Sequence, residues 1–272
     1  MLCPTECSLS HLIGHFLLEV VVMGIKRELP DKEKMRKRAK YMKNMKELVA
    51  VEPINKAVPN GLEKGNGKTG ISGKIFDRIF VWNLPPVITC PGMSNWCKYN
   101  CYNADDRYEK FPIDKWCENL WWVLNDKKTL EKRINFQLEE HKAERTAVRI
   151  HSSGDFFSNE YIAFWRDIIS RNSDIYFWAY TRSWTVKELV DDIKELDKLD
   201  NIKLILSWDE TMTQTIDGFA KSIVYNSDEE ISVALNRKDG IACPEQYDLV
   251  SSCADCGICI NKSLGNIYFV LH

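Results

Sequence analysis

The sequence predicts an α/β fold built as a partial (β/α) barrel of about six parallel strands, with a cysteine-rich C-terminal segment. Short β-rich runs alternate with longer amphipathic runs, polar residues follow the β-rich runs, and seven of the ten cysteines fall in two tight groups. Because a connection between two parallel strands crosses over in a right-handed sense, this alternation winds one continuous sheet. An open doubly wound sheet is the alternative architecture.

The expected elements of this fold begin near residue 75. Strands are expected at residues 75–82, 87–89, 147–151, 175–180, 202–206, 222–225 and 231–235, and helices at 112–140 in two pieces, 159–171 and 185–198. The stretch 159–171 carries its aromatic and aliphatic side chains on one side, as a core-facing helix does. Thr185 stands three residues before Glu188, which is the spacing of a capping box at a helix start.

Three regions are expected along the chain. Residues 1–73 form an N-terminal extension with a basic helix at 31–49 and a glycine-rich linker, residues 74–240 form the partial barrel with the first cysteine group, and residues 241–272 form a cluster-binding segment. Met23 begins a Met-Gly-Ile-Lys sequence that is typical of a protein start. Residues 1–22 are therefore interpreted as an upstream extension of the reading frame, in which Cys3 and Cys7 carry no function.

Composition and charge limit the classes of function. With 44% hydrophobic and 28% charged residues, the chain has the composition of a soluble globular protein. The chain has 37 Lys and Arg residues against 39 Asp and Glu residues, and its net charge of -2 does not indicate non-specific electrostatic binding of nucleic acid. The basic helix leaves nucleic acid as an alternative partner. The apolar stretch 12–23 is shorter than a membrane span and lacks the basic start of a secretion signal. A cytoplasmic protein with no membrane partner is expected.

Polar residues follow four of the expected strands. Cys90 follows the first, His151 and Asp155 the second, Thr181 and Arg182 the third, and Ser207 and Asp209 the fourth. Because the carboxyl ends of parallel strands form one rim, these side chains are expected to line one pocket. Helix capping is the alternative explanation for the Ser, Thr and Asp residues. It does not explain His151 or Arg182.

Four residues of this rim are the candidate catalytic residues: His151, Asp155, Arg182 and Asp209. His151 is expected to titrate near neutral pH, and together with Asp155 it would bind a cofactor or move a proton. Arg182 would clamp a carboxylate or a phosphate, because its planar guanidinium suits both groups.

The first cysteine group has the spacing Cys90-x6-Cys97-x3-Cys101 in a turn-rich loop. Thiolates are soft ligands, so three of them in one loop favour an iron–sulfur cluster or zinc. Three protein ligands leave one metal position open, where a substrate or cofactor can bind directly.

The second cysteine group consists of Cys243, followed by Pro244, and of Cys253, Cys256 and Cys259 at intervals of three. This compact spacing with a Cys-Pro pair is that of bacterial ferredoxin loops, whereas zinc sites usually take two separated Cys-x2-Cys pairs. The group therefore favours a [4Fe–4S] cluster over zinc, and exchange of ligands between the two groups stays open. Cys117, on an expected helix, is interpreted as a core thiol.

Several segments resemble the phage-encoded gene product 88 family. The shared residues are Thr89-Cys90-Pro91-Gly92, Cys97-x3-Cys101-Tyr102 with Arg107, residues 148–158, residues 177–181, Ser207-Trp208-Asp209, and the cysteines of the second group with Pro244. The resemblance spans about residues 75–272. It implies a phage or prophage setting, and so the cytoplasm of a host cell, more than it implies an activity.

A looser resemblance is to radical S-adenosylmethionine enzymes, which place three cysteines after the first strand of a partial barrel. It implies that Cys90, Cys97 and Cys101 hold a catalytic cluster whose open iron binds S-adenosylmethionine. By the same resemblance, the loop Ser152-Ser153-Gly154-Asp155 takes the place of the segment that holds the methionyl amine. Thr181 and Ser207, at the ends of the next two strands, are the other candidate cofactor-binding residues. This chain has the spacing C-x6-C-x3-C where those enzymes have C-x3-C-x2-C, and it lacks their Gly-Gly-Glu segment.

Two functions from different classes follow. The first is a radical-generating iron–sulfur enzyme with a three-cysteine catalytic cluster, a four-cysteine auxiliary cluster, and a flavodoxin or ferredoxin as reductant. The alternative is a zinc-binding protein without catalysis that binds nucleic acid or acts in host takeover. A thiol–disulfide protein is disfavoured, because no isolated Cys-x2-Cys pair opens a helix after a strand.

Overall fold

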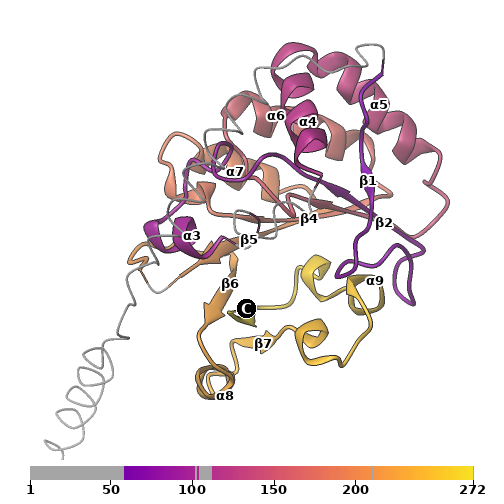
Figure 1. Cartoon of the computed structure of the whole chain (residues 1–272). Helices are drawn as coiled ribbons and strands as arrows, with labels where there is room; N and C mark the ends of the chain where they lie inside the picture. Colours follow the sequence, from indigo (N-terminus) through magenta and orange to yellow (C-terminus); the bar gives the residue numbers. More distant parts are fainter. Residues whose placement is uncertain (1–57, 102, 104–111, 210, 272) are drawn as a thin grey trace, which may run out of the picture. The chain divides into compact units, whose positions relative to one another are not determined.

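The computed structural model describes residues 58–101, 103, 112–209 and 211–271 of the 272-residue chain (Figure 1). The expected basic helix at 31–49 and the expected extension at 1–22 lie outside the described residues. So do Tyr102 and Arg107, which belong to the gene product 88 resemblance.

One sheet of eight strands organises the described part of the chain. Its strand order is β1-β2-β3-β4-β5-β6-β8-β7. The strands are β1 (Glu63–Lys64), β2 (Arg78–Trp82), β3 (Thr146–Ile150), β4 (Tyr176–Thr181), β5 (Ile202–Trp208), β6 (Ala220–Tyr225), β7 (Gly240–Ala242) and β8 (Asn266–Val270). Within this sheet β1 pairs antiparallel with β2, and every other pairing is parallel.

The predicted α/β class is confirmed, whereas the predicted barrel is not. Strands β2 to β6 are neighbours in the order in which they occur in the sequence, as expected for a sheet wound in one direction. The sheet is open, because β1 and β7 stand at the two ends of the strand order. It has eight strands rather than about six, since the short edge strands β1 and β7 and the C-terminal strand β8 were not expected.

Four helices cover one face of the sheet (Figure 1). They are α4 (Ile113–Asn125), α5 (Lys127–Glu139), α6 (Asn159–Arg171) and α7 (Val190–Asp197). The amphipathic pattern that predicted the helix at 159–171 is confirmed, and Ser158 caps α6 by accepting a hydrogen bond from the backbone N–H of Tyr161 at 3.2 Å.

Side chains of each strand alternate between the two faces of the sheet. Val148 and Ile150 of β3 face the helices and join Leu204 of β5 in the large apolar core. Their neighbour Ala147 packs on the opposite face, against Trp178 of β4 and Ala254 of the C-terminal segment. The second face is thus covered by the cysteine-rich segment rather than by helices of the main core.

One expected strand is a helix. Residues 231–235 lie in α8 (Asp228–Leu235), although their β-branched and apolar content favoured a strand. Ser227 caps this helix, accepting a hydrogen bond from the backbone N–H of Glu230 at 3.3 Å, and the first turn is acidic. Both features stabilise a helix start, and they outweigh the propensity of the residues that follow.

Two further expectations are corrected. Residues 87–89 form a turn rather than a strand, because Val87 adopts the left-handed backbone with φ of 69°. The helix expected at 185–198 begins at Val190, after the short 3-10 helix η2 (Ser183–Thr185). Thr185 is not its cap: the Thr185 hydroxyl donates to the carbonyl oxygens of Arg182 and Gly92, at 2.9 and 3.3 Å.

The C-terminal segment contains η3 (Pro244–Tyr247), α9 (Cys253–Cys256) and η4 (Ile258–Ile260). It docks on residues 68–76 by backbone hydrogen bonds. Cys253 N–H donates to the Lys68 carbonyl oxygen at 3.0 Å, and Phe76 N–H donates to the Ala254 carbonyl oxygen at 3.1 Å. A Cβ atom at Gly73 would lie 2.6 Å from the Ala254 carbonyl carbon, so the approach requires glycine there.

The described part of the glycine-rich linker, residues 58–73, therefore belongs to the packed body of the protein. The division into three regions stays a prediction.

None of the helices in the described part of the chain has the length and apolarity that a membrane crossing requires.

Candidate functional site

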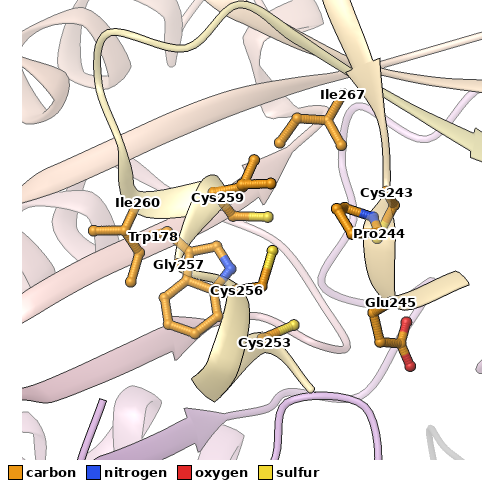
Figure 2. Close-up of a pocket in the computed structure, with 11 residues that line it drawn as sticks. Trp178, Cys243, Pro244, Glu245, Cys253, Cys256, Gly257, Cys259, Ile260 and Ile267 are labelled. Atoms are coloured by element: carbon orange, nitrogen blue, oxygen red, sulfur yellow. The ribbon is translucent and has the colours of Figure 1, made fainter. Parts of the chain in front are cut away.

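A cavity between the C-terminal segment and the sheet is lined by all four cysteines of the second group (Figure 2). Its other walls are largely apolar and include Trp178, Ile258, Ile260 and Ile267; the cavity is partly open to solvent and has a volume of about 20 Å³. Figure 2 shows the sulfurs of Cys253, Cys256 and Cys259 facing this space, with Cys243 across it. We call it the C-terminal cysteine cavity.

Local backbone geometry places three of these sulfurs on one side of the cavity. Helix α9 carries Cys253 and Cys256 one turn apart. Gly257 then adopts the left-handed backbone, with φ of 67°, which ends the helix and lets η4 bring Cys259 back to the same side. Cys243 comes from the end of β7, so the four thiols are contributed by two separate stretches of chain.

Polar and basic groups of the sheet lie beneath the sulfurs. The hydroxyl oxygen of Tyr180 on β4 is 2.8 Å from the Sγ atom of Cys259. The guanidinium carbon of Arg149 on β3 stands 5.5 Å from the centroid of the Tyr180 ring. Lys203 on β5 is buried, and its ammonium group donates to the carbonyl oxygens of Asn261 and Leu264, at 2.6 and 2.9 Å.

Burial controls the protonation of these thiols. It raises the pKa of Cys253 to about 11 and that of Cys259 to about 12, although Arg149 opposes the rise in both and Tyr180 opposes it in Cys259. The pKa of Cys256 is raised too, again by burial. Cys253, Cys256 and Cys259 are therefore protonated near neutral pH, and a metal that binds them must release those protons.

The eight cysteines in the described part of the chain form no disulfide bonds. Within that same part, no group of three or more His, Cys, Asp or Glu side chains meets the geometry expected of a metal-ion site. The donor set of the C-terminal cysteine cavity nonetheless has the chemistry that soft metals and iron–sulfur clusters prefer, namely several thiols in a sparsely polar enclosure.

The first cysteine group lies at the carboxyl end of the parallel strands. Cys90 follows β2, and its nearest electrostatic neighbours are Asp155, Cys101 and Cys97. Burial and these acidic neighbours raise the pKa of the Cys90 thiol well above its usual range. The three cysteines and a rim carboxylate thus lie near enough to interact electrostatically, and their joint binding of a metal stays a prediction.

Two glycines let this cysteine loop approach the rim closely. A Cβ atom at Gly92 would lie 2.1 Å from the carbonyl oxygen of Arg182. One at Gly154, whose φ is 84°, would lie 2.8 Å from the hydroxyl of Thr89. The loop around Cys90 is therefore packed between the ends of β3 and β4, where a larger residue at either glycine would push it away.

Helix α3 (Asn95–Asn100), which carries Cys97, is tied to the rim through its N-cap. Ser94 accepts a hydrogen bond from the backbone N–H of Cys97 at 3.0 Å and donates one to the carboxylate of Asp209 at 2.6 Å. Asp209 also pairs with the guanidinium of Arg182, and both side chains are buried. Arg182 is therefore engaged within the protein, so its geometry positions α3 and does not present a free clamp for an anion.

Asp155 is held by three donors rather than facing open space. Its carboxylate accepts hydrogen bonds from the Thr181 hydroxyl at 2.7 Å and from the backbone N–H groups of Arg182 at 2.7 Å and Phe156 at 2.8 Å. Burial raises the pKa of Asp155, while these hydrogen bonds oppose the rise. Asp155 thus joins the loop after β3 to the end of β4, and its charge acts on the Cys90 thiol.

His151 is buried under the rim. Its Nε2 atom lies 2.9 Å from the Tyr161 hydroxyl, which also accepts a hydrogen bond from the indole of Trp82 at 2.8 Å. Its Nδ1 atom has no hydrogen-bond partner. Burial lowers the pKa of His151 to about 3, so the imidazole is neutral at pH 7. The expectation that it titrates near neutrality is not met, because nothing compensates its desolvation.

The remaining candidate residues lie in the same rim. The Ser152 carbonyl oxygen accepts from Asn103 at 2.8 Å, and the Ser153 N–H donates to the Asn83 side chain at 3.0 Å. The Ser207 carbonyl oxygen accepts from the indole of Trp184 at 3.2 Å. Sequence reasoning missed Ser94, Tyr161 and Tyr180. A helix-cap signal at Ser94, three residues before Cys97, could have identified the first, whereas the other two depend on which face of an element meets the site.

Fold and site together define a class: an α/β protein with an open, mostly parallel sheet, a cysteine group at the carboxyl rim of the sheet, and a cysteine-lined cavity on one of its faces. The chain belongs to the gene product 88 family, whose model matches residues 53–262. The family resemblance seen in the sequence is therefore confirmed, and the likeness to radical S-adenosylmethionine enzymes stays a prediction.

Two phage relatives show the extent of the family likeness. The chain is 29% identical over 218 residues to the Gene 88 protein of Mycobacterium phage D29, covering 72% of this chain and 86% of that protein. It is 28% identical over 217 residues to the Gene 88 protein of Mycobacterium phage L5, with the same coverage of 72% and 86%. No solved structure matches this chain.

The buried ion pair at the rim yields a prediction about stability. Asp209→Ala leaves the Arg182 guanidinium buried without its counter-charge, so the free energy of unfolding should fall by about 3–5 kcal/mol. Urea denaturation at pH 7 measures this loss.

The double variant Arg182→Met with Asp209→Leu removes both charges and should regain most of that loss. Asp77→Ala, which breaks the exposed pair with Arg145, is the matched control and should change stability far less. Equal losses for the two single variants would contradict the account.

His151 yields a prediction about pH. Its folded-state pKa of about 3 lies below the ordinary value of 6.5, so the unfolded chain takes up the proton first as pH falls. Stability from this residue is complete above about pH 6.5 and declines toward pH 3, by about 2 kcal/mol between pH 7 and pH 5.

Urea denaturation at the two pH values tests this prediction in a variant without the imidazole. His151→Asn suits the left-handed backbone at this position, where φ is 65°, and should remove that part of the pH dependence. His141→Gln replaces a partly exposed imidazole and should keep it. An unchanged slope in the Asn variant would show that His151 is not held neutral.

Proposed function

We propose that this protein is a phage iron–sulfur protein whose second cysteine group, Cys243, Cys253, Cys256 and Cys259, holds a [4Fe–4S] cluster. The observation that carries the proposal is the C-terminal cysteine cavity, where four thiols from two chain segments line one space. Four thiolates complete the ligand set of such a cluster, and their ferredoxin-like spacing is supported by the turn at Gly257 that gathers three of them.

The surroundings of the cavity suit a cluster. Trp178, Ile258 and Ile267 supply apolar walls that limit access of water. Hydrogen-bond donors for cluster thiolates are also present. The Tyr180 hydroxyl would donate to Cys259 and the backbone N–H of Ile258 to Cys256. A single zinc ion on the same thiolates is the competing outcome.

We further propose that Cys90, Cys97 and Cys101 hold a second cluster with one open iron position at the rim. Support comes from the placement of the three cysteines beside the carboxyl ends of β2, β3 and β4, the edge at which parallel α/β proteins bind ligands. The consecutive strand order with helices on one face is also that of a partial barrel. When bound at such a position, S-adenosylmethionine would accept an electron from the cluster.

In this proposal the chain's own rim residues bind and orient. The backbone of Ser152, Ser153 and Gly154 forms the loop against the cysteine loop, and the hydroxyl of Thr181 and the backbone of Ser207 border it. Asp155 fixes the loop next to Cys90. Asp209, through Ser94 and Arg182, holds the helix that carries Cys97.

Two conditions complete the proposal. A flavodoxin or ferredoxin of the host would supply electrons. The thiols require a reducing compartment, which the cytoplasm of a host cell provides.

Cluster content tests the proposal directly. Anaerobically purified or reconstituted protein should be brown, absorb broadly near about 400 nm, and contain iron and sulfide in equal amounts, about eight of each when both groups are filled. Cys256→Ala should lose the C-terminal cluster and Cys97→Ala the rim cluster, each leaving about four irons. Cys117→Ala removes a buried thiol of α4 that belongs to neither group, and should keep both clusters.

Two results would contradict the proposal. A colourless protein with one zinc per chain would replace the C-terminal cluster with a zinc site. A brown protein in which Cys97→Ala keeps its full iron content would remove the rim cluster. Loss of all iron in the Cys117→Ala control would mean that thiol substitution acts through the fold, and urea denaturation of each variant separates that case.

The open rim position has its own test. Protein with both clusters, reduced with dithionite and given S-adenosylmethionine, should release 5′-deoxyadenosine, and Cys97→Ala should not. Formation of the product by Cys256→Ala at a comparable rate would place the reaction at the rim. An iron-loaded wild-type protein that forms none would leave the iron–sulfur assignment standing and overturn the S-adenosylmethionine proposal.

A further inference from the structure

The face of the sheet beneath the C-terminal cysteine cavity carries polar groups that its packing role does not require. Strands with one face on an apolar segment normally present apolar side chains there, and Trp178 and Ile205 do so. Tyr180, Arg149 and Lys203 break that pattern at neighbouring positions of β4, β3 and β5. Lys203 is buried, and Tyr180 and Arg149 are half-buried. Withdrawing polar groups from water in this way costs free energy unless each has a partner.

Each of these groups interacts with Cys259 itself or with a residue close to it. The Tyr180 hydroxyl contacts the Cys259 sulfur at 2.8 Å. Arg149 lies against the Tyr180 ring, 5.5 Å from its centroid, which holds the ring in place and adds positive charge near the sulfur. Lys203 donates to the carbonyl oxygens of Asn261 and Leu264 in the loop directly after Cys259.

We infer that Tyr180 sets the reduction potential of the C-terminal cluster by donating its hydroxyl hydrogen bond to the Cys259 thiolate, so that this cluster exchanges electrons rather than only holding the fold together. The inference rests on the proposed function. A hydrogen bond to a ligating sulfur withdraws electron density from the cluster, and nearby cations favour the more negative reduced form. The half-buried Tyr180 and Arg149 and the buried Lys203 therefore act in the same direction, toward easier reduction.

A matched pair of variants tests the inference. Tyr180→Phe removes the hydroxyl and keeps the ring beside Arg149. Tyr176→Phe makes the same chemical change four residues earlier on β4, at an exposed tyrosine whose ring contacts Phe76. Both variants are reconstituted anaerobically, assayed for iron and sulfide, and titrated against redox mediators while the spectrum of each cluster is followed.

We expect Tyr180→Phe to keep its clusters and to make reduction of one of them about tenfold less favourable, which is about 59 mV lower for a one-electron couple. Tyr176→Phe should match the wild type. In a Cys97→Ala background, where the C-terminal cluster remains alone, the same shift should persist, which assigns it to that cluster.

Each contrary outcome has a distinct meaning. Clusters present in Tyr180→Phe with an unchanged potential overturn the inference and leave the iron–sulfur assignment intact. Wild-type protein without iron and sulfide overturns both. If Tyr180→Phe does not fold, 3-fluorotyrosine at position 180 keeps the ring and makes the hydroxyl a stronger donor, so the potential should rise; an unchanged potential there overturns the inference on its own.

Discussion

The division of one parallel sheet into two unlike faces is the constraint on which the rest of this structure depends. Alternation along each strand sends one set of side chains under α4 to α7, where Trp82, Ile150 and Leu204 are buried in the main core. The other set must be covered too, and residues 243–265, between β7 and β8, supply the cover. The cysteine cavity exists because that cover is a short, turn-rich segment bound to residues 68–76, not a regular helix.

The same sheet also determines where the first cysteine group lies. Parallel strands end at one rim, so the loop after β2 meets the ends of β3, β4 and β5. Asp155 and the Arg182–Asp209 pair occupy that rim mainly as structural links: one joins neighbouring strand ends beside Cys90, and the other holds the helix of Cys97 through Ser94. These three residues, which the sequence marks as candidate catalytic groups, thus form hydrogen bonds and an ion pair within the protein, and their catalytic role stays a prediction.

Sequence reasoning predicted the parts of the fold in which local pattern and tertiary structure agree. The strands at 147–151, 175–180 and 202–206 are apolar runs buried on both faces, and such runs are the sequence pattern typical of parallel strands. It failed where a local signal was overruled or hidden. The β-branched stretch 231–235 became helical because Ser227 caps it, and the strand expected at 87–89 is broken by the left-handed Val87 after two prolines.

For the site, the spacing of the cysteines predicted which thiols lie together, because Cys253, Cys256 and Cys259 are close in sequence and Gly257 allows the return. The contacts of Tyr180 and Lys203 with the segment after Cys256 could not be predicted. They depend on strand register and on which face of the sheet the C-terminal segment covers, and a one-residue shift would have turned both side chains toward the helices.

The most direct test of the account is a crystal structure of anaerobically reconstituted protein with diffraction data collected at the iron absorption edge. The account predicts an anomalous peak from iron inside the cavity bounded by residues 243, 253, 256 and 259, with each sulfur bonded to a separate iron. A zinc peak in that cavity, a disulfide between any two of the four thiols, or a cavity closed by side chains would contradict it.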